Sequence, residues 1–168
     1  YTPKSETLKE IAKSVTYRRP VWCLEFSFKP LRMIYVDVPQ PSGRMQRKLI
    51  WYLVYRVKNT GRHMSPAAKT DEFGHTTFVT ERVNHSVRFF PHLDRLVPSA
   101  KDPIRRREDP SMRLMNSVEI SSVKIEVSDR TDRGVWGVAT WENVDPNIDF
   151  FSIYIKGLSN ANKFEDPP

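Results

Sequence analysis

The sequence predicts an all-β protein, an immunoglobulin-like antiparallel β-sandwich of seven or eight strands with a short N-terminal helix or arm. Runs of alternating apolar and polar residues recur along the chain, and turn residues separate them. The 4 Trp, 6 Tyr and 9 Phe residues supply large side chains for a sandwich core. The 168 residues fit one domain, so we divide the chain into the arm, 1–19, and the β-sandwich domain, 20–168.

The N-terminal segment is expected to form a short helix over residues 6–15. Ser5 is a favourable N-cap residue, and apolar residues follow it at helical spacing. Terminal segments are often loosely held, so this stretch could equally be an arm that docks on a neighbouring subunit. Both interpretations stay open.

The stretch 49–58 has the pattern of a central strand, because apolar residues fill both alternating sets of positions over most of its length. Asn59-Thr60-Gly61 then predicts a turn, since Asn and Gly tolerate positive φ. The first set, which we expect to point into the sandwich, includes Trp51, Leu53 and Tyr55. The second set, which we expect beneath a loop or a neighbouring subunit, includes Tyr52 and Val54.

The segments on either side of this strand are also expected to be extended. Period-two alternation predicts strands over 21–28 and 31–38, and further strands over 75–83 and 86–90. The intervening stretch 62–74 has no sustained period. We therefore expect a surface loop there.

The last part of the chain is expected to hold one helical turn and three strands. Prolines in 91–110 leave room for at most a turn or two of helix, around 104–108. The strands are predicted over 118–127, 134–141 and 149–158. Short strands with turn residues between them favour a sandwich over an α/β fold.

Charge and cysteine content set limits on the partners. The chain carries 27 Lys and Arg against 20 Asp and Glu, a net charge of +7, which favours anionic partners without selecting one. The basic residues are scattered, and no nucleic-acid-binding module is recognisable, so nucleic acid is not expected. Cys23 is the only cysteine, which excludes an internal disulfide. No apolar run reaches the ~18 residues of a membrane span.

Acidic residues form the best candidate metal site, a calcium site between two loops. Its candidate ligands are Asp129 and Asp132 in one loop, and Asp145, Asn147 and Asp149 in the next. Alternating oxygen ligands of this kind open a calcium-binding loop, because they can converge on a hard cation. The glycine and glutamate that complete an EF-hand are missing, and the capping of turns by Asp and Asn side chains is the commoner reason for such residues.

No catalytic site is expected, so we do not predict an enzyme. The four histidines lack the spacing of a zinc site, and Cys23 lies in an alternating strand rather than in a nucleophile elbow. Trp136 and Trp141 are five residues apart, which places them on opposite faces of a regular strand. One of them, with Tyr154 or Phe151, could form an exposed aromatic platform for a sugar or a protein partner.

Six stretches of characteristic sequence follow one another along the chain. They are WYLVYRVKNTG (51–61), VRFFP (87–91), IRRREDP (104–110), LMNSVEI (114–120), VWGVATWENVDPNIDFFSIYIKGLSNA (135–161) and FEDPP (164–168). Together they resemble an uncharacterised, planctomycete-type family of bacterial proteins. The resemblance covers most of the chain after residue 20 and implies an exported protein, periplasmic or on the cell surface, with an immunoglobulin-like core. It implies no activity and no catalytic residues.

The sequence therefore predicts a non-catalytic structural or accessory subunit of a larger assembly, bound to a protein partner or to further copies of itself. The expected partner-binding residues are Tyr52, Val54, Trp136, Trp141 and Tyr154. The alternative is a carbohydrate-binding module that uses exposed aromatic residues, with or without calcium. No other cofactor is expected.

Overall fold

The computed structural model describes residue 17 and residues 19–91, 97–128 and 134–161, and it is mostly β, with 46% strand and 13% helix. The predicted predominance of strands is confirmed. The expected helix over 6–15 lies outside the described residues, as do Asp129 and Asp132 of the candidate calcium site.

The main sheet is built around one long strand, β3. Its members are β1 (Glu25–Phe28), β2 (Arg32–Pro39), β3 (Met45–Lys58), β7 (Leu114–Met115) and β9 (Val135–Glu142). The strand order is β1-β3-β9-β7, and β2 also pairs with β3. β3 pairs with β9 along one edge. Along its other edge, residues 45–52 of β3 pair with β2 and residues 55–58 pair with β1. All pairs are antiparallel except β7 with β9.

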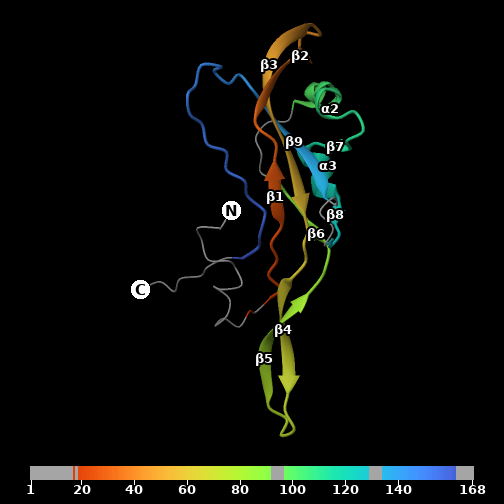
Figure 1. Ribbon diagram of the computed structural model, residues 1–168, viewed down its shortest axis with the longest axis vertical. Helices are drawn as coiled ribbons and strands as arrows, with labels where there is room; N and C mark the ends of the chain where they lie inside the picture. The colour runs from red at the N-terminus through yellow and green to blue at the C-terminus, as the bar shows by residue number, and fades with distance from the viewer. Residues whose placement is uncertain (1–16, 18, 92–96, 129–133, 162–168) are drawn as a thin grey trace.

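The other elements are two small sheets and three short helices. The strands are β4 (His63–Thr70) with β5 (Thr76–Val83), and β6 (Val87–Arg88) with β8 (Lys124–Ile125). The helices are η1 (Pro98–Ala100), α2 (Lys101–Glu108) and α3 (Ser117–Ser122). In Figure 1, α2 and α3 lie on one side of β1 and β3, and the blue segment after β9 runs down the other side. The β4–β5 hairpin projects from the end of the molecule.

β3 buries both faces, as its sequence predicts. Leu53, Tyr55 and Val57 belong to one core, with side chains from β6, α3 and β8. Tyr52 and Val54 belong to a second core on the opposite face, covered by η1 and α2. The side chains that cover the first face include Val87, Phe89, Ile120 and Ile125, and those that cover the second include Val97, Ala100, Ile104 and Leu114.

The helices α2 and α3 lie where the sequence predicted a turn of helix and a strand, respectively. The predicted turn of helix at 104–108 is confirmed as α2, which starts at Lys101 and buries Ile104. The predicted strand over 118–127 is wrong in its first half, which forms α3. There the Glu119 N–H donates to Asn116 Oδ1 at 2.8 Å and the Asn116 N–H donates to Glu119 Oε2 at 2.8 Å. This capping box stabilises the start of a helix against the strand pattern.

Two other predictions are also corrected. The expected loop over 62–74 is in large part strand β4, whose residues pair with β5 from His63↔Val83 to Thr70↔Thr76. Pairing along a hairpin overrides the missing alternation, because it satisfies backbone groups whatever the side chains are. The expected strand over 149–158 is an extended segment without ladder pairing, and Ile153 and Ile155 attach it to the first core.

Gly137 shows how closely β3 and β9 approach. It pairs with Tyr55, and a Cβ atom at Gly137 would overlap the Tyr55 ring. We expect Gly137→Ala to lower the free energy of unfolding by about 1–3 kcal/mol, because a methyl group forces the buried ring out of place. Chemical denaturation measures the change.

The same substitution in a Tyr55→Leu background is the control. Without the aromatic ring, the cost of Gly137→Ala should shrink, since the two residues are in direct contact and their effects are coupled. Equal costs in both backgrounds would show that the ring does not set the requirement for glycine.

Candidate partner-binding surface

The first face of the main sheet is covered only in part. Phe28 pairs with Tyr55, Met33 with Trp51 and Tyr35 with Leu49, so their side chains share the face that carries the first core. β6, α3 and β8 cover this face at the Tyr55 end of β3. Toward the other end, and on the edge strand β1, side chains remain exposed, with 61% exposure at Tyr35 beside Leu49 and 65% at Phe28 beside Tyr55.

We define the apolar face as Phe28, Met33, Tyr35, Met45 and Phe151, all of which are exposed. The Phe151 ring meets Trp51 edge-on, with 5.7 Å between the centroids, and so lies at the border of this surface. The Arg47 guanidinium lies 5.4 Å from the centroid of the Tyr35 ring. The surface therefore combines apolar side chains with a cation held over an aromatic ring.

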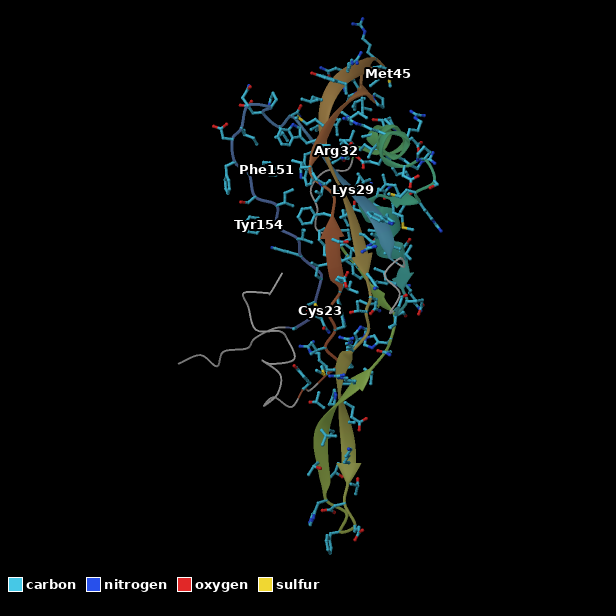
Figure 2. All side chains as sticks on the ribbon, in the orientation of Figure 1. Cys23, Lys29, Arg32, Met45, Phe151 and Tyr154 are labelled. Carbon is cyan, nitrogen blue, oxygen red and sulfur yellow. The ribbon has the colours of Figure 1, made fainter. Side chains whose placement is uncertain are left out.

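The segment after β9 extends this exposed surface. Phe150 is 85% exposed and Tyr154 is 79% exposed, while Ile153 and Ile155 between and beyond them pack on the first core. Figure 2 shows Phe151 and Tyr154 on the same extended segment beside β1. Alternate side chains thus point to the core and to solvent, which leaves large aromatic groups in water.

A buried donor lies beneath this surface. Trp51 is buried, and its Nε1 has no hydrogen-bond partner among the described residues. An indole N–H that loses water without gaining an acceptor costs about 1–3 kcal/mol.

The opposite face of the sheet is closed by an ion-pair cluster that docks α2. The Glu108 carboxylate, whose side chain is 2% exposed, accepts from Lys29 Nζ at 3.0 Å and from Arg32 Nη1 at 2.9 Å. The hydroxyl of Tyr52 also donates to Glu108 Oε1 at 2.9 Å. Burial by itself raises the pKa of Glu108, but the hydrogen bonds from Lys29 and Tyr52 and the nearby cations outweigh it and lower that pKa.

The predicted site residues divide into buried and exposed ones. Tyr52 and Val54 are covered by η1 and α2, so the chain itself fills the partner surface predicted at these two residues. Burial, and then Glu108, raise the pKa of Tyr52. Trp141 is half-buried against the first core and Trp136 against the second, so the prediction that they face opposite sides is confirmed. Of the five predicted partner-binding residues, Tyr154 is the one that is broadly exposed.

Two cations lie near the ring of Trp136. Lys29 Nζ lies 5.8 Å and the Arg56 guanidinium 5.6 Å from the centroid of its ring. Arg56 is also the cross-strand partner of Trp136. Both cations take up space near the ring, so Trp136 acts in the packing of β1, β3 and β9.

The described residues of the candidate calcium site form a turn on the surface. Asp145, Asn147 and Asp149 are exposed, and the Asn147 N–H donates to Asp145 Oδ1 at 2.9 Å. Within 19–91, 97–128 and 134–161, no three His, Cys, Asp or Glu side chains come close enough to hold a metal ion. The arrangement of the described part is that of an Asx turn.

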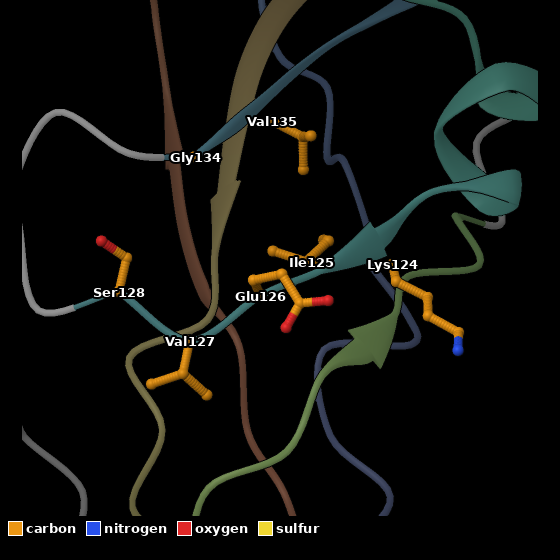
Figure 3. A pocket seen from close by; sticks show the side chains of 7 residues that line it. All are labelled: Lys124, Ile125, Glu126, Val127, Ser128, Gly134 and Val135. Carbon is orange, nitrogen blue, oxygen red and sulfur yellow. The ribbon is translucent and has the colours of Figure 1, made fainter.

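An open hollow of about 420 Å³ lies beside β8, lined by Lys124, Ile125, Glu126, Val127, Ser128, Gly134 and Val135. Figure 3 shows the polar ends of Lys124 and Ser128 pointing to opposite ends of the hollow. A catalytic pocket needs polar groups that converge on one point. The side chains drawn there do not provide such a point.

Two further findings concern the chain as a whole. No helix in the described part of the chain is long and apolar enough to cross a membrane. In comparisons with protein-family models, curated proteins and solved structures, nothing matches this chain. The candidate surface therefore stands on the geometry alone.

The ion-pair cluster gives a prediction for stability and its pH dependence. We expect Glu108→Gln to lower the free energy of unfolding at pH 7 by about 1–3 kcal/mol, because it removes the charge that Lys29 and Arg32 share. The folded-state pKa of Glu108 is lowered, so its contribution is complete above the ordinary Glu value of about 4.3 and is lost as pH falls through the lower value. Denaturation at several pH values measures both effects.

Asp102→Asn is the matched control. Asp102 is exposed and lies 3.5 Å from Arg105, so its loss should change the unfolding free energy by less than about 0.5 kcal/mol. If the gap between wild type and Glu108→Gln persists undiminished at about pH 3, the charge of Glu108 is not its source.

Proposed function

We propose that this protein is a non-catalytic, exported subunit of a larger assembly, with an immunoglobulin-like β-sandwich core, and that it binds a protein partner through the apolar face. The observation that carries the proposal is the cluster of exposed side chains on β1, β2 and the segment after β9. The location outside the cytoplasm rests on the family resemblance of the sequence.

The chemistry of the apolar face suits a protein partner. Monomeric proteins rarely leave large contiguous apolar patches in water, and such patches mark interaction sites. Phe, Tyr, Met and Arg are enriched at protein interfaces, and all four occur here, at Phe28, Tyr35, Met33 and Arg47.

The projecting hairpin supports the same proposal. β4 and β5 pair with each other, and most of their residues are half-buried or exposed. An isolated two-stranded hairpin is only marginally stable in water. The exposed side chains of Phe73 and Phe78 give it apolar surface that contact with a partner would cover.

Carbohydrate binding finds less support. A sugar platform needs aromatic rings that are exposed together on one face. Trp136 and Trp141 are half-buried in different cores, so they cannot form one platform. The exposed rings of Phe28, Tyr35 and Phe151 share their face with Met33 and Met45, a composition typical of protein interfaces. We therefore favour the protein partner.

Site-specific photocrosslinking tests the proposal. A benzophenone side chain is placed at Tyr35 on the apolar face, and in a second variant at Val118, which is equally open to solvent but lies on α3. In the native source, Tyr35 should crosslink to one defined protein and Val118 should not. Absence of any specific adduct at Tyr35, in a chain that also stays monomeric by light scattering, would contradict the proposal.

Substitution of the same face gives the energetic test. We expect Phe28→Ser with Tyr35→Ser to weaken association with the crosslinked partner at least tenfold, because exposed aromatics at the centre of an interface carry much of its energy. Stability of the isolated chain should change by less than about 0.5 kcal/mol per substitution, since both side chains are already in water. Val118→Ser is the control, and association should be unaffected by it.

A further inference from the structure

The base of the β4–β5 hairpin holds a pair of histidines in direct contact. His63, the first residue of β4, is 1% exposed and is the only fully buried residue of the hairpin strands. Its Nδ1 lies 3.0 Å from Nδ1 of His85, and its Nε2 lies 3.0 Å from Oδ1 of Asn59. The two rings meet edge to face, with 4.1 Å between their centroids.

The surrounding hydrogen bonds determine which nitrogen of His63 carries its proton. The Asn59 amide nitrogen donates to the carbonyls of His85 at 2.9 Å and Ile125 at 3.0 Å, so its oxygen is the atom that faces His63. The same oxygen accepts from the Gly61 N–H at 2.9 Å. Because Oδ1 can only accept, Nε2 of neutral His63 must carry the proton and Nδ1 must be a lone pair. His85 therefore donates its Nδ1–H to His63.

In the described part of the chain, backbone and side-chain contacts at the base of the hairpin join it to the rest of the molecule. β4 and β5 pair with each other, and one bridge, Val21↔Met64, joins β4 to the chain before β1. Beside it, the Arg62 N–H donates to Asn84 Oδ1 at 3.0 Å. The His63 contacts complete this base. Loss of the histidine pair would leave the hairpin attached mainly through its backbone.

The pair tolerates one extra proton but not two. The first can bind Nε2 of half-buried His85, which leaves the Nδ1–H bond to His63 in place. The second must bind Nδ1 of His63, where it replaces the accepting lone pair and puts two N–H groups and two positive charges face to face. The other charged residues on the adjoining segments are Lys58 at the end of β3, Arg62 after it, Glu81 and Arg82 on β5, Arg88 on β6, Lys124 on β8 and Glu126 after it. Burial lowers the pKa of His63, and the charge that lowers it further is that of His85.

We propose that His63 and His85 form an acid-sensitive latch that holds the β4–β5 hairpin in a fixed orientation at neutral pH and releases it when both rings are protonated. The proposal rests on the Nδ1 to Nδ1 contact, the fixed Asn59 amide and the full burial of His63 at the base of the hairpin. It does not depend on the proposed partner, because the latch belongs to the isolated chain.

The direction of the pH effect follows from the burial of His63. Burial, and then the positive charge of His85, lower the pKa of His63 below its ordinary value of about 6.5. The closed latch is therefore fully stabilised above that value. Its stabilisation is lost as pH falls through the lower pKa of folded His63.

Hydrogen exchange of the isolated protein tests the latch. Between pH 7.5 and about pH 5, after correction for intrinsic exchange, amides at the base of the hairpin should lose about tenfold protection relative to amides of β3 and β9. His85→Asn should keep its protection, because the Asn amide can donate to neutral His63 and can rotate to accept from protonated His63. His75→Asn is the matched control, since His75 lies exposed at the hairpin tip, and this variant should behave as the wild type.

A second measurement keeps the test independent of any variant. Imidazole ¹⁵N chemical shifts of the wild type at pH 7.5 should show His63 protonated on Nε2 and bare on Nδ1, with the reverse assignment for His85. The proposal is overturned if His63 carries its proton on Nδ1, if hairpin protection is the same at both pH values, or if His85→Asn loses protection as the wild type does.

Discussion

β3 must bury both of its faces, and the arrangement of the other elements follows from that requirement. Leu53 and Tyr55 on one face need a layer over them, and Tyr52 and Val54 on the other face need another. Both layers come from the chain after residue 86, since β6, η1, α2, α3 and β8 are all short elements of that region. These elements all lie between β5 and β9 in the chain, so β9 pairs with β3 only after the segments that cover the two faces.

The two layers differ in how they are held and in how much they cover. On the second face, α2 is fixed by a buried carboxylate that accepts from Lys29, Arg32 and Tyr52. These bonds tie β2, β3 and the connection between β1 and β2 to the helix. On the first face, contacts are apolar and stop short of the β2 end of β3. The exposed side chain of Tyr35 lies beyond the end of this layer, and Phe28 is exposed on the edge strand β1 beside Tyr55. Because the first layer does not cover the whole face, part of the sheet keeps an exposed apolar surface.

The sequence predicted elements whose cause is local or strongly periodic. The two-sided burial of 49–58, the opposite orientation of Trp136 and Trp141 and the helix around Ile104 follow from periodicity and proline placement. It did not predict α3, although Asn116 and Glu119 carry the signature of a capping box. The apolar face was missed because alternation shows which side chains share a face, and only tertiary structure shows which faces stay uncovered. The histidine latch was missed because His63 and His85 are 22 residues apart, with no metal-like spacing.

Pro66 on β4 bears on how a protein with a projecting hairpin avoids uncontrolled polymerisation. Val21 and Met64 exchange backbone hydrogen bonds of 2.7 and 2.9 Å on the outer edge of β4, and Pro66 lies two residues further on, facing the same way. Proline has no N–H to give, so the outer edge of β4 lacks a donor where an added strand would need one. This edge of the β4–β5 hairpin therefore resists the stacking of chain upon chain that produces fibrils.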